Sequence, residues 1–94
     1  MPIKVSIVTS GLDYPRTKRL EWVSDLDMDE SNLVKSVLTS NTETECSTTL
    51  YFEDQSTLDA YRTANAAKIE KLNDMRDANS MVTVQTVETV DTIP

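Results

Sequence analysis

The side chains that most often carry out catalysis or bind metals are scarce in this sequence of 94 residues. It contains no histidine, one cysteine (Cys46) and one glycine (Gly11). Without histidine there is no Ser-His or Cys-His nucleophile and no imidazole ligand for a metal. A single cysteine excludes an intrachain disulfide and a CxxC motif, and a single glycine excludes the glycine-rich loops that cradle phosphates. We therefore expect no catalytic residues of these kinds, no metal and no cofactor.

The acidic run Asp25-Leu26-Asp27-Met28-Asp29-Glu30 has the alternating carboxylates of a calcium loop. An EF-hand loop would require glycine where Glu30 stands and glutamate where Ser36 stands. Both residues are wrong, so we interpret the acids as the start of a helix or a solvated loop. Cys46 lies on the inward side of a predicted strand and is interpreted as a small core residue.

One face of a predicted sheet is the best candidate for a binding surface, because it mixes hydroxyl, amide, aromatic and apolar side chains. Its members are Ser6, Val8, Thr49, Tyr51, Thr83, Gln85 and Val87. Such a face can pair with a second copy of the chain, and a symmetric dimer is the commonest oligomer. It can also line a ligand cavity in that dimer, with hydrogen bonds from Tyr51, Thr49, Ser6 and Gln85. A solvated sheet face is the third interpretation.

Three strands follow from alternating or β-branched runs, over Ile3–Thr9, Cys46–Phe52 and Met81–Val90. In the last of these, Val82 and Val84 share the face that we expect under the helices, whereas Val87 falls on the opposite face. Either a bulge lies near Gln85–Thr86 or both faces of this strand are covered, and we favour the second explanation.

A long helix is predicted over Ser56–Ala78. Ser56 is a favoured N-cap residue, and Asp59 stands in the capping-box position. Helical spacing places an apolar stripe on one side, formed by Leu58, Tyr61, Ile69 and Leu72. Three polar residues interrupt the same side, namely Asn65, Lys68 and Arg76.

The region between the strands predicted over Ile3–Thr9 and Cys46–Phe52 allows two interpretations. In the favoured one, a helix over Ser24–Val34 precedes a strand over Ser36–Ser40, which forms a hairpin with Cys46–Phe52. In the other, a strand over Arg19–Ser24 precedes a helix over Asn32–Leu38. The first gives the order β-α-β-β-α-β. We therefore predict one α+β ferredoxin-like domain over residues 1–94, with an antiparallel four-stranded sheet and two helices on one face.

The stretch Leu50–Tyr61, with the sequence LYFEDQSTLDAY, resembles the strand-to-helix junction of dimeric α+β barrel proteins. The resemblance implies open sheet faces that pair into a barrel. It implies a cofactor-free monooxygenase, a haem-handling enzyme or a protein of unknown activity. Many enzymatic members carry a histidine in or after the second helix, but Ala64–Lys68 contain none, which argues against haem ligation or histidine chemistry here. The stretch Thr17–Trp22 also resembles small uncharacterised proteins of tailed phages.

The charge of the chain limits its partners. The formal net charge is -7, and the acidic side chains are concentrated in residues 20–59. This charge is unfavourable for nucleic acid, so we expect no nucleic-acid partner, while a basic protein partner stays open. No apolar stretch reaches the roughly 18 residues of a membrane span, and Met1–Lys4 does not begin a secretory signal. We expect a cytoplasmic protein without membrane contact.

Together these features favour a small non-enzymatic homodimeric binding or structural interaction protein. The first alternative is a cofactor-free enzyme or small-molecule binder with a pocket around Tyr51 in a dimeric α+β barrel. The second alternative is an acidic module that docks on a basic protein.

Overall fold

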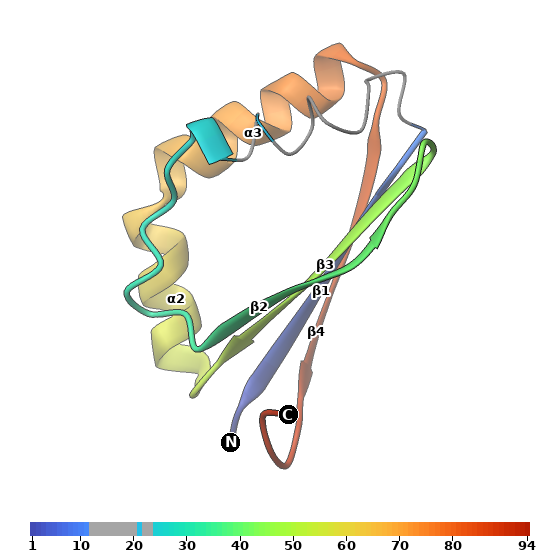
Figure 1. Cartoon of the computed structure of the whole chain (residues 1–94). Coiled ribbons are helices and arrows are strands. Elements are labelled where there is room, and N and C mark those ends of the chain that lie inside the picture. The colour runs from blue at the N-terminus through green and yellow to red at the C-terminus, as the bar shows by residue number, and fades with distance from the viewer. Residues whose placement is uncertain (12–20, 22–23) are drawn as a thin grey trace.

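The computed structural model of the chain describes residues 1–11, 21 and 24–94. Its elements are β1 (Ile3–Ser10), β2 (Lys35–Asn41), β3 (Glu45–Phe52), α2 (Gln55–Ala64), α3 (Ala66–Ala78) and β4 (Val82–Thr89). Within the described residues, the strands form one sheet in the order β2-β3-β1-β4, and every neighbouring pair is antiparallel. Helices α2 and α3 lie on one face of this sheet (Figure 1). The structure confirms the predicted α+β ferredoxin-like fold.

The central strand β1 positions both of its neighbours. Val5 lies opposite Leu50 of β3 and Val87 of β4, whereas Ser6 lies opposite Thr49 and Thr86. Because side chains alternate along a strand, Val5 and its partners share the helix-facing side, and Ser6 and its partners share the open side. We call the side of the sheet opposite the helices the open face.

The assignment of the faces of β4 from the sequence is wrong. The pairing of β1 with β4 runs from Ile3 opposite Thr89 to Ser10 opposite Val82 without a shift, so no bulge occurs. Val82 and Val84 therefore lie on the open face, where they are 61% and 58% exposed. A one-residue change in register moves every side chain to the other face, and the pairing with β1 decides this register. All eight residues of β4 are exposed, so neither face of this strand is covered in the single chain.

The predicted helix over Ser24–Val34 is also wrong. Only Ser24 and Asp25 of that range are helical, and residues 27–34 form irregular backbone with turns. The carboxylate of Asp29 accepts hydrogen bonds from the Ser31 backbone N–H at 3.0 Å and from the Ser31 hydroxyl at 2.7 Å. These bonds stabilise a turn that competes with a helix. The carboxylates that suggested a helix N-terminus thus organise a loop.

The strand predicted over Ser36–Ser40 is confirmed within β2, which pairs with β3 as a hairpin and has a register shift between Leu38 and Ser40. The alternative helix over Asn32–Leu38 is therefore wrong. Most of the alternative strand over Arg19–Ser24 lies outside the described residues.

The helix predicted over Ser56–Ala78 is divided into α2 and α3 at Asn65 (Figure 1). The N-cap is Asp54, whose carboxylate accepts from the Thr57 N–H at 2.9 Å, so the capping box begins two residues earlier than predicted. At the break, the Asn65 side chain donates to Tyr61 O at 2.9 Å and also contacts the 27–30 loop. This contact with a distant segment replaces the continuation of one helix.

The hydrophobic core lies between α2 and the adjoining end of the sheet. It consists of Ile3, Val5, Phe52, Leu58 and Tyr61. The Phe52 and Tyr61 rings meet edge to face, with centroids 5.2 Å apart and an interplanar angle of 62°. Burial of a large apolar side chain contributes about 1.5–3 kcal/mol, so this cluster anchors α2 on the sheet.

Candidate functional site

A cavity of about 630 Å³ lies between the helix-facing side of the sheet and the helices. This volume is within the range of about 300–1,000 Å³ that is typical of small-molecule sites. Side chains from every strand, both helices and the 28–33 segment line it. Its sheet side consists of Val5, Ile7, Thr9, Ser36, Cys46, Thr48, Leu50, Phe52, Thr83 and Gln85.

One end of the cavity is apolar. Because α2 begins directly after β3 ends at Phe52, it covers the end of the sheet that carries Leu50 and Phe52. Leu58 and Tyr61 from α2 complete this apolar end, and Met28 and Leu33 pack against it from the irregular segment. We call this group the apolar end.

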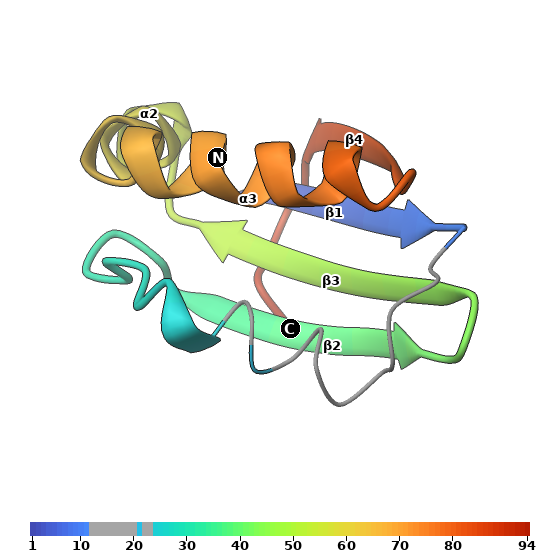
Figure 2. The same cartoon turned by 90° about the horizontal axis from the view of Figure 1, so that it is seen from above.

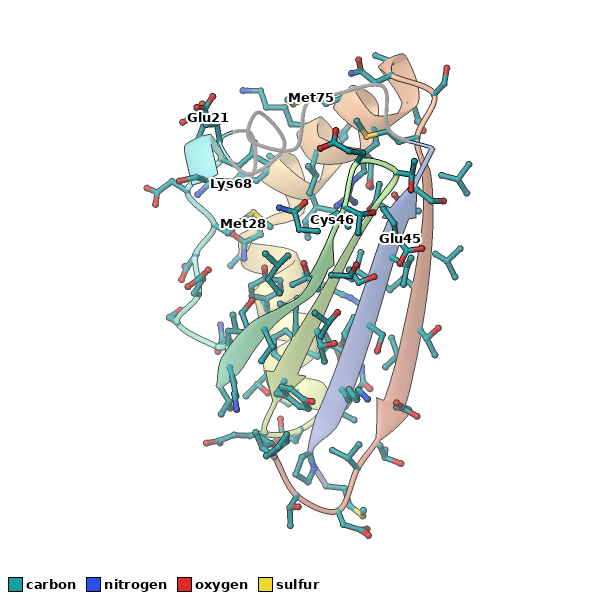
Figure 3. The ribbon with its side chains drawn as sticks, turned by 45° about the vertical axis from the view of Figure 1, so that its right-hand side comes forward. Glu21, Met28, Glu45, Cys46, Lys68 and Met75 are labelled. Atoms are coloured by element: carbon teal, nitrogen blue, oxygen red, sulfur yellow. The ribbon has the colours of Figure 1, made fainter. Side chains whose placement is uncertain are left out.

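The other end of the cavity is polar. Thr9 pairs with Cys46 on one side and with Thr83 on the other, so the three side chains form a row across the sheet. The hydroxyls of Thr9 and Thr83 are 3.3 Å apart, at hydrogen-bonding distance. Figure 3 shows Cys46 on the helix side of β3 and its neighbour Glu45 on the other side. Arg76, in the last turn of α3, also lines the cavity. We call Thr9, Cys46, Thr83 and Arg76 the polar end.

Two titratable groups of the cavity are shifted by their surroundings. Burial lowers the pKa of the Arg76 guanidinium, and the nearby Cys46 acts in the opposite direction. A guanidinium nevertheless stays charged, because its ordinary pKa is above 12. Burial raises the pKa of the Tyr61 phenol, and the negative charge of Glu30 adds to this effect. Tyr61 therefore stays neutral near pH 7 and can donate a hydrogen bond.

The Arg76 side chain makes no hydrogen bond or ion pair with any residue that the structure describes. Among the described residues, the ion pair within 4.0 Å is that of Lys4 with Glu88 on the open face, where Lys4 Nζ lies 3.6 Å from Glu88 Oε1. A half-buried guanidinium that lines a cavity and has no partner among the described residues can bind an anion there.

The structure separates the residues of the predicted binding face. Ser6, Val8, Thr49 and Tyr51 share the open face, whereas Thr83, Gln85 and Val87 lie on the helix-facing side. Tyr51 is only 9% exposed and Thr49 only 7% exposed in the single chain. Tyr51 does not line the cavity of the single chain, which lies on the other side of the sheet.

The C-terminal segment is hydrogen-bonded to residues near Tyr51 at the same end of the sheet. After β4, the Val90 N–H donates to Pro2 O at 3.0 Å, and the Lys35 ammonium donates to Pro94 O at 2.9 Å. Lys35 lies opposite Tyr51 in the sheet. Figure 2 shows the segment crossing from β4 toward β2, where the C-terminus lies.

The sequence reasoning did not recognise the cavity residues as a site. From the sequence, Cys46 is interpreted as a core residue and Tyr61 as part of the apolar stripe, while Arg76 only interrupts that stripe. That interruption was the available signal. Of its three members, Asn65 hydrogen-bonds Asp29, the Lys68 ammonium donates to Asp27 O, and Arg76 lines the cavity.

Two further properties concern only the described part of the chain. Within it, no group of three or more His, Cys, Asp or Glu side chains is placed to hold a metal ion. Its helices include none that is long and apolar enough to cross a membrane.

The fold and the cavity define an α+β ferredoxin-like protein with a space of ligand size between its sheet and its helices. No protein-family model matches the chain, and no curated protein matches it. Solved structures do resemble it. The cofactor-independent oxygenase SnoaB from Streptomyces nogalater superimposes with a TM-score of 0.71 at 7% identity, over 98% of this chain and 95% of that chain.

Two other solved structures have the same fold. A proposed antibiotic biosynthesis monooxygenase from Deinococcus radiodurans has a TM-score of 0.71 at 8% identity, over 100% of this chain and 97% of that one. A dimeric ferredoxin-like protein from an uncultured marine organism has a TM-score of 0.67 at 12% identity, over 100% of both chains. The predicted resemblance to dimeric α+β barrel proteins is therefore confirmed at the level of the fold.

The prediction of a non-enzymatic interaction protein is wrong. Two of the similar structures carry the names of an oxygenase and a monooxygenase, which points to an enzyme-like group of ferredoxin-fold proteins. The physical reason is that the sequence interpretation considered a binding surface on the open face only, whereas the space of ligand size in the single chain lies between the sheet and the helices.

Proposed function

We propose that the chain is a small-molecule-binding enzyme of the cofactor-free oxygenase type, and that its substrate occupies the cavity between the sheet and the helices. The cavity of about 630 Å³ carries this proposal, because it combines an apolar end with a few polar groups. The oxygenase names of two proteins with the same fold support the reaction class. One fold hosts many activities, so the site is what must be tested.

The reaction class sets a condition on the substrate. In most oxygenases a metal or flavin supplies electrons to O₂. A cofactor-free oxygenase must take those electrons from the substrate itself, so the substrate has to be electron-rich and conjugated. The aromatic and aliphatic side chains of the apolar end suit such a compound, and Tyr61 offers one hydrogen-bond donor to it.

The functional unit in this proposal is a homodimer that forms through the open face. Val8, Val82 and Val84 lie together on this face, and the last two are more than half exposed. A similar structure is named as a dimeric ferredoxin-like protein. Light scattering should give twice the chain mass of 10.6 kDa. Val84→Lys should shift the protein toward the monomer, because it places an unpaired charge in the interface.

Cavity binding can be tested with the neutral fluorescent probe N-phenyl-1-naphthylamine. We expect it to bind the wild-type chain and to be excluded by Thr48→Trp, which fills the cavity from β3. Thr63→Trp is the matched control, because Thr63 is exposed on α2 and does not line the cavity. Equal probe binding by both variants would contradict the cavity as the binding site.

The enzymatic part requires a measurement of oxygen. An oxygen electrode should record uptake with at least one compound from a panel of hydroxynaphthalenes and related conjugated phenols. The uptake should exceed the spontaneous rate, be lost in Thr48→Trp and be retained in Thr63→Trp. Probe binding without oxygen uptake on any compound would contradict the oxygenase assignment.

A further inference from the structure

The lining of the cavity changes from apolar to polar along the strands. The two ends are far enough apart to bind two different ends of a ligand. Cys46 and Leu50 are four residues apart on β3 and both line the cavity. At about 3.3 Å per residue, this separation is about 13 Å. That length suits a bicyclic or tricyclic aromatic molecule with one substituent.

Arg76 is held in place at the polar end by the end of its own helix. Its carbonyl accepts hydrogen bonds from the N–H groups of Asn79 at 3.2 Å and Met81 at 3.0 Å, and Met81 is buried. A cation in the last turn is also favoured by the helix dipole. These contacts fix the backbone from which the guanidinium reaches the cavity, so less freedom is lost when a ligand binds.

The groups beside Arg76 can add hydrogen bonds to an anion. Thr9 and Thr83 contribute hydroxyls from neighbouring strands, and Cys46 contributes a thiol between Thr9 and the β2 edge. Thr9 is buried, so its hydroxyl has little water to bond. A hydroxyl can donate to a carboxylate while it accepts from a neighbour, as the distance of 3.3 Å between Thr9 and Thr83 allows.

We infer that the cavity selects anionic aromatic molecules, and that the ligand lies with its ring at the apolar end and its negatively charged oxygen at Arg76. This inference rests on the proposed function in that it takes the cavity to be the substrate site. It adds the charge and the orientation of the substrate. An aromatic carboxylate or phenolate has both properties.

The acidity of the protein does not prevent this recognition. Glu30, Glu70 and Asp74 also line the cavity, but all three are exposed. Exposed charges are screened by salt within about 8–10 Å, whereas a half-buried guanidinium is screened much less. A charge-assisted hydrogen bond to Arg76 can therefore outweigh the repulsion from these carboxylates.

The test compares 2-naphthoate with its neutral analogue 2-naphthamide, each measured by displacement of N-phenyl-1-naphthylamine. The two molecules have the same ring and nearly the same shape, so they differ mainly in charge. We expect wild-type protein to bind 2-naphthoate about 10- to 100-fold more tightly, the factor expected for a hydrogen bond to a charged partner. This comparison needs no variant that might misfold.

Variants then assign the effect to Arg76. Arg76→Gln should remove the preference for 2-naphthoate and leave the affinity for 2-naphthamide within about threefold, while Arg76→Lys should keep part of the preference because it keeps the charge. Lys71→Gln removes a positive charge from the same helix at an exposed position that does not line the cavity, and it should leave both affinities unchanged.

The possible failures are distinguishable. Equal binding of the two compounds by wild-type protein overturns the anionic class and leaves the proposed cavity site intact. Equal losses in Arg76→Gln and Lys71→Gln overturn the role of Arg76. If N-phenyl-1-naphthylamine does not bind at all, the proposed function and this inference both fail.

Discussion

Replacing Asn65 with alanine should destabilise the fold by about 2–4 kcal/mol. Asn65 is completely buried. Its Oδ1 accepts from the Asp29 N–H at 2.7 Å, and its Nδ2 donates to Asp29 O and to Tyr61 O, each at 2.9 Å. These bonds tie the junction of α2 and α3 to the 27–30 loop, which is far away in the sequence.

The magnitude follows from what each group loses. A typical hydrogen bond contributes about 0.5–1.5 kcal/mol net, and a buried group left without a partner costs about 1–3 kcal/mol. Tyr61 O keeps a partner, because it also accepts from the Asn65 backbone N–H at 3.1 Å. The N–H and C=O of Asp29 lose theirs and are only partly buried, so water offsets some of the cost. The sum is about 2–4 kcal/mol.

Urea unfolding followed by circular dichroism measures the loss, and native-state hydrogen exchange locates it. The Asp29 amide should exchange much faster in Asn65→Ala than in wild-type protein. Asn73→Ala is the matched control: it makes the same substitution at an exposed position of α3 and should change stability by less than about 0.5 kcal/mol. If Asn65→Ala is as stable as Asn73→Ala, or if exchange at Asp29 is unchanged, the argument that Asn65 pins the loop is refuted.

Three smaller predictions concern local backbone and charge. Asp54→Ala should cost about 1 kcal/mol by thermal unfolding and Ser56→Ala close to nothing, since Asp54 is the N-cap; equal effects would contradict this capping assignment. Gly11→Ala should destabilise by about 1 kcal/mol because Gly11 has φ +74°, although a Cβ would have room there, and an unchanged melting temperature would count against it. The bonds from Ser31 lower the pKa of the Asp29 carboxyl, so the stability they add is present above the pKa of the unfolded chain and is lost as pH falls through the folded pKa. Ser31→Ala removes the hydroxyl bond but keeps the backbone N–H bond, so it should raise the pKa of Asp29 part of the way in an NMR titration, and an unshifted titration would show that the hydroxyl does not contribute.

Much of the fold could be predicted because its signals are local. Alternation in Ile3–Thr9 and Cys46–Phe52 identifies β1 and β3, since a strand places every second side chain on one face. The hairpin of β2 with β3 follows from a short turn between two such runs. The apolar stripe after Ser56 identifies the helical region, because the side chains of Leu58 and Tyr61 reach the core at helical spacing.

The site could not be predicted in the same way. The orientation of β4 depends on its partner, because its own valines occupy both faces and only the pairing with β1 decides which of them lie under the helices. The same holds for the 27–30 loop, since a run of carboxylates suits a helix start and a turn equally well until Asn65 binds its backbone.

Local periodicity in this chain thus identified β1, β3, β4 and the helical region after Ser56, which was enough to predict an α+β sheet with helical cover on one side. Tertiary contacts decided the rest: the break at Asn65, the face of each β4 side chain, and the meeting of Arg76 from α3 with Cys46 from β3 at one end of a cavity. The physical reason is that a cavity has no sequence period. It exists only where elements far apart in the chain pack against one another and leave space between them.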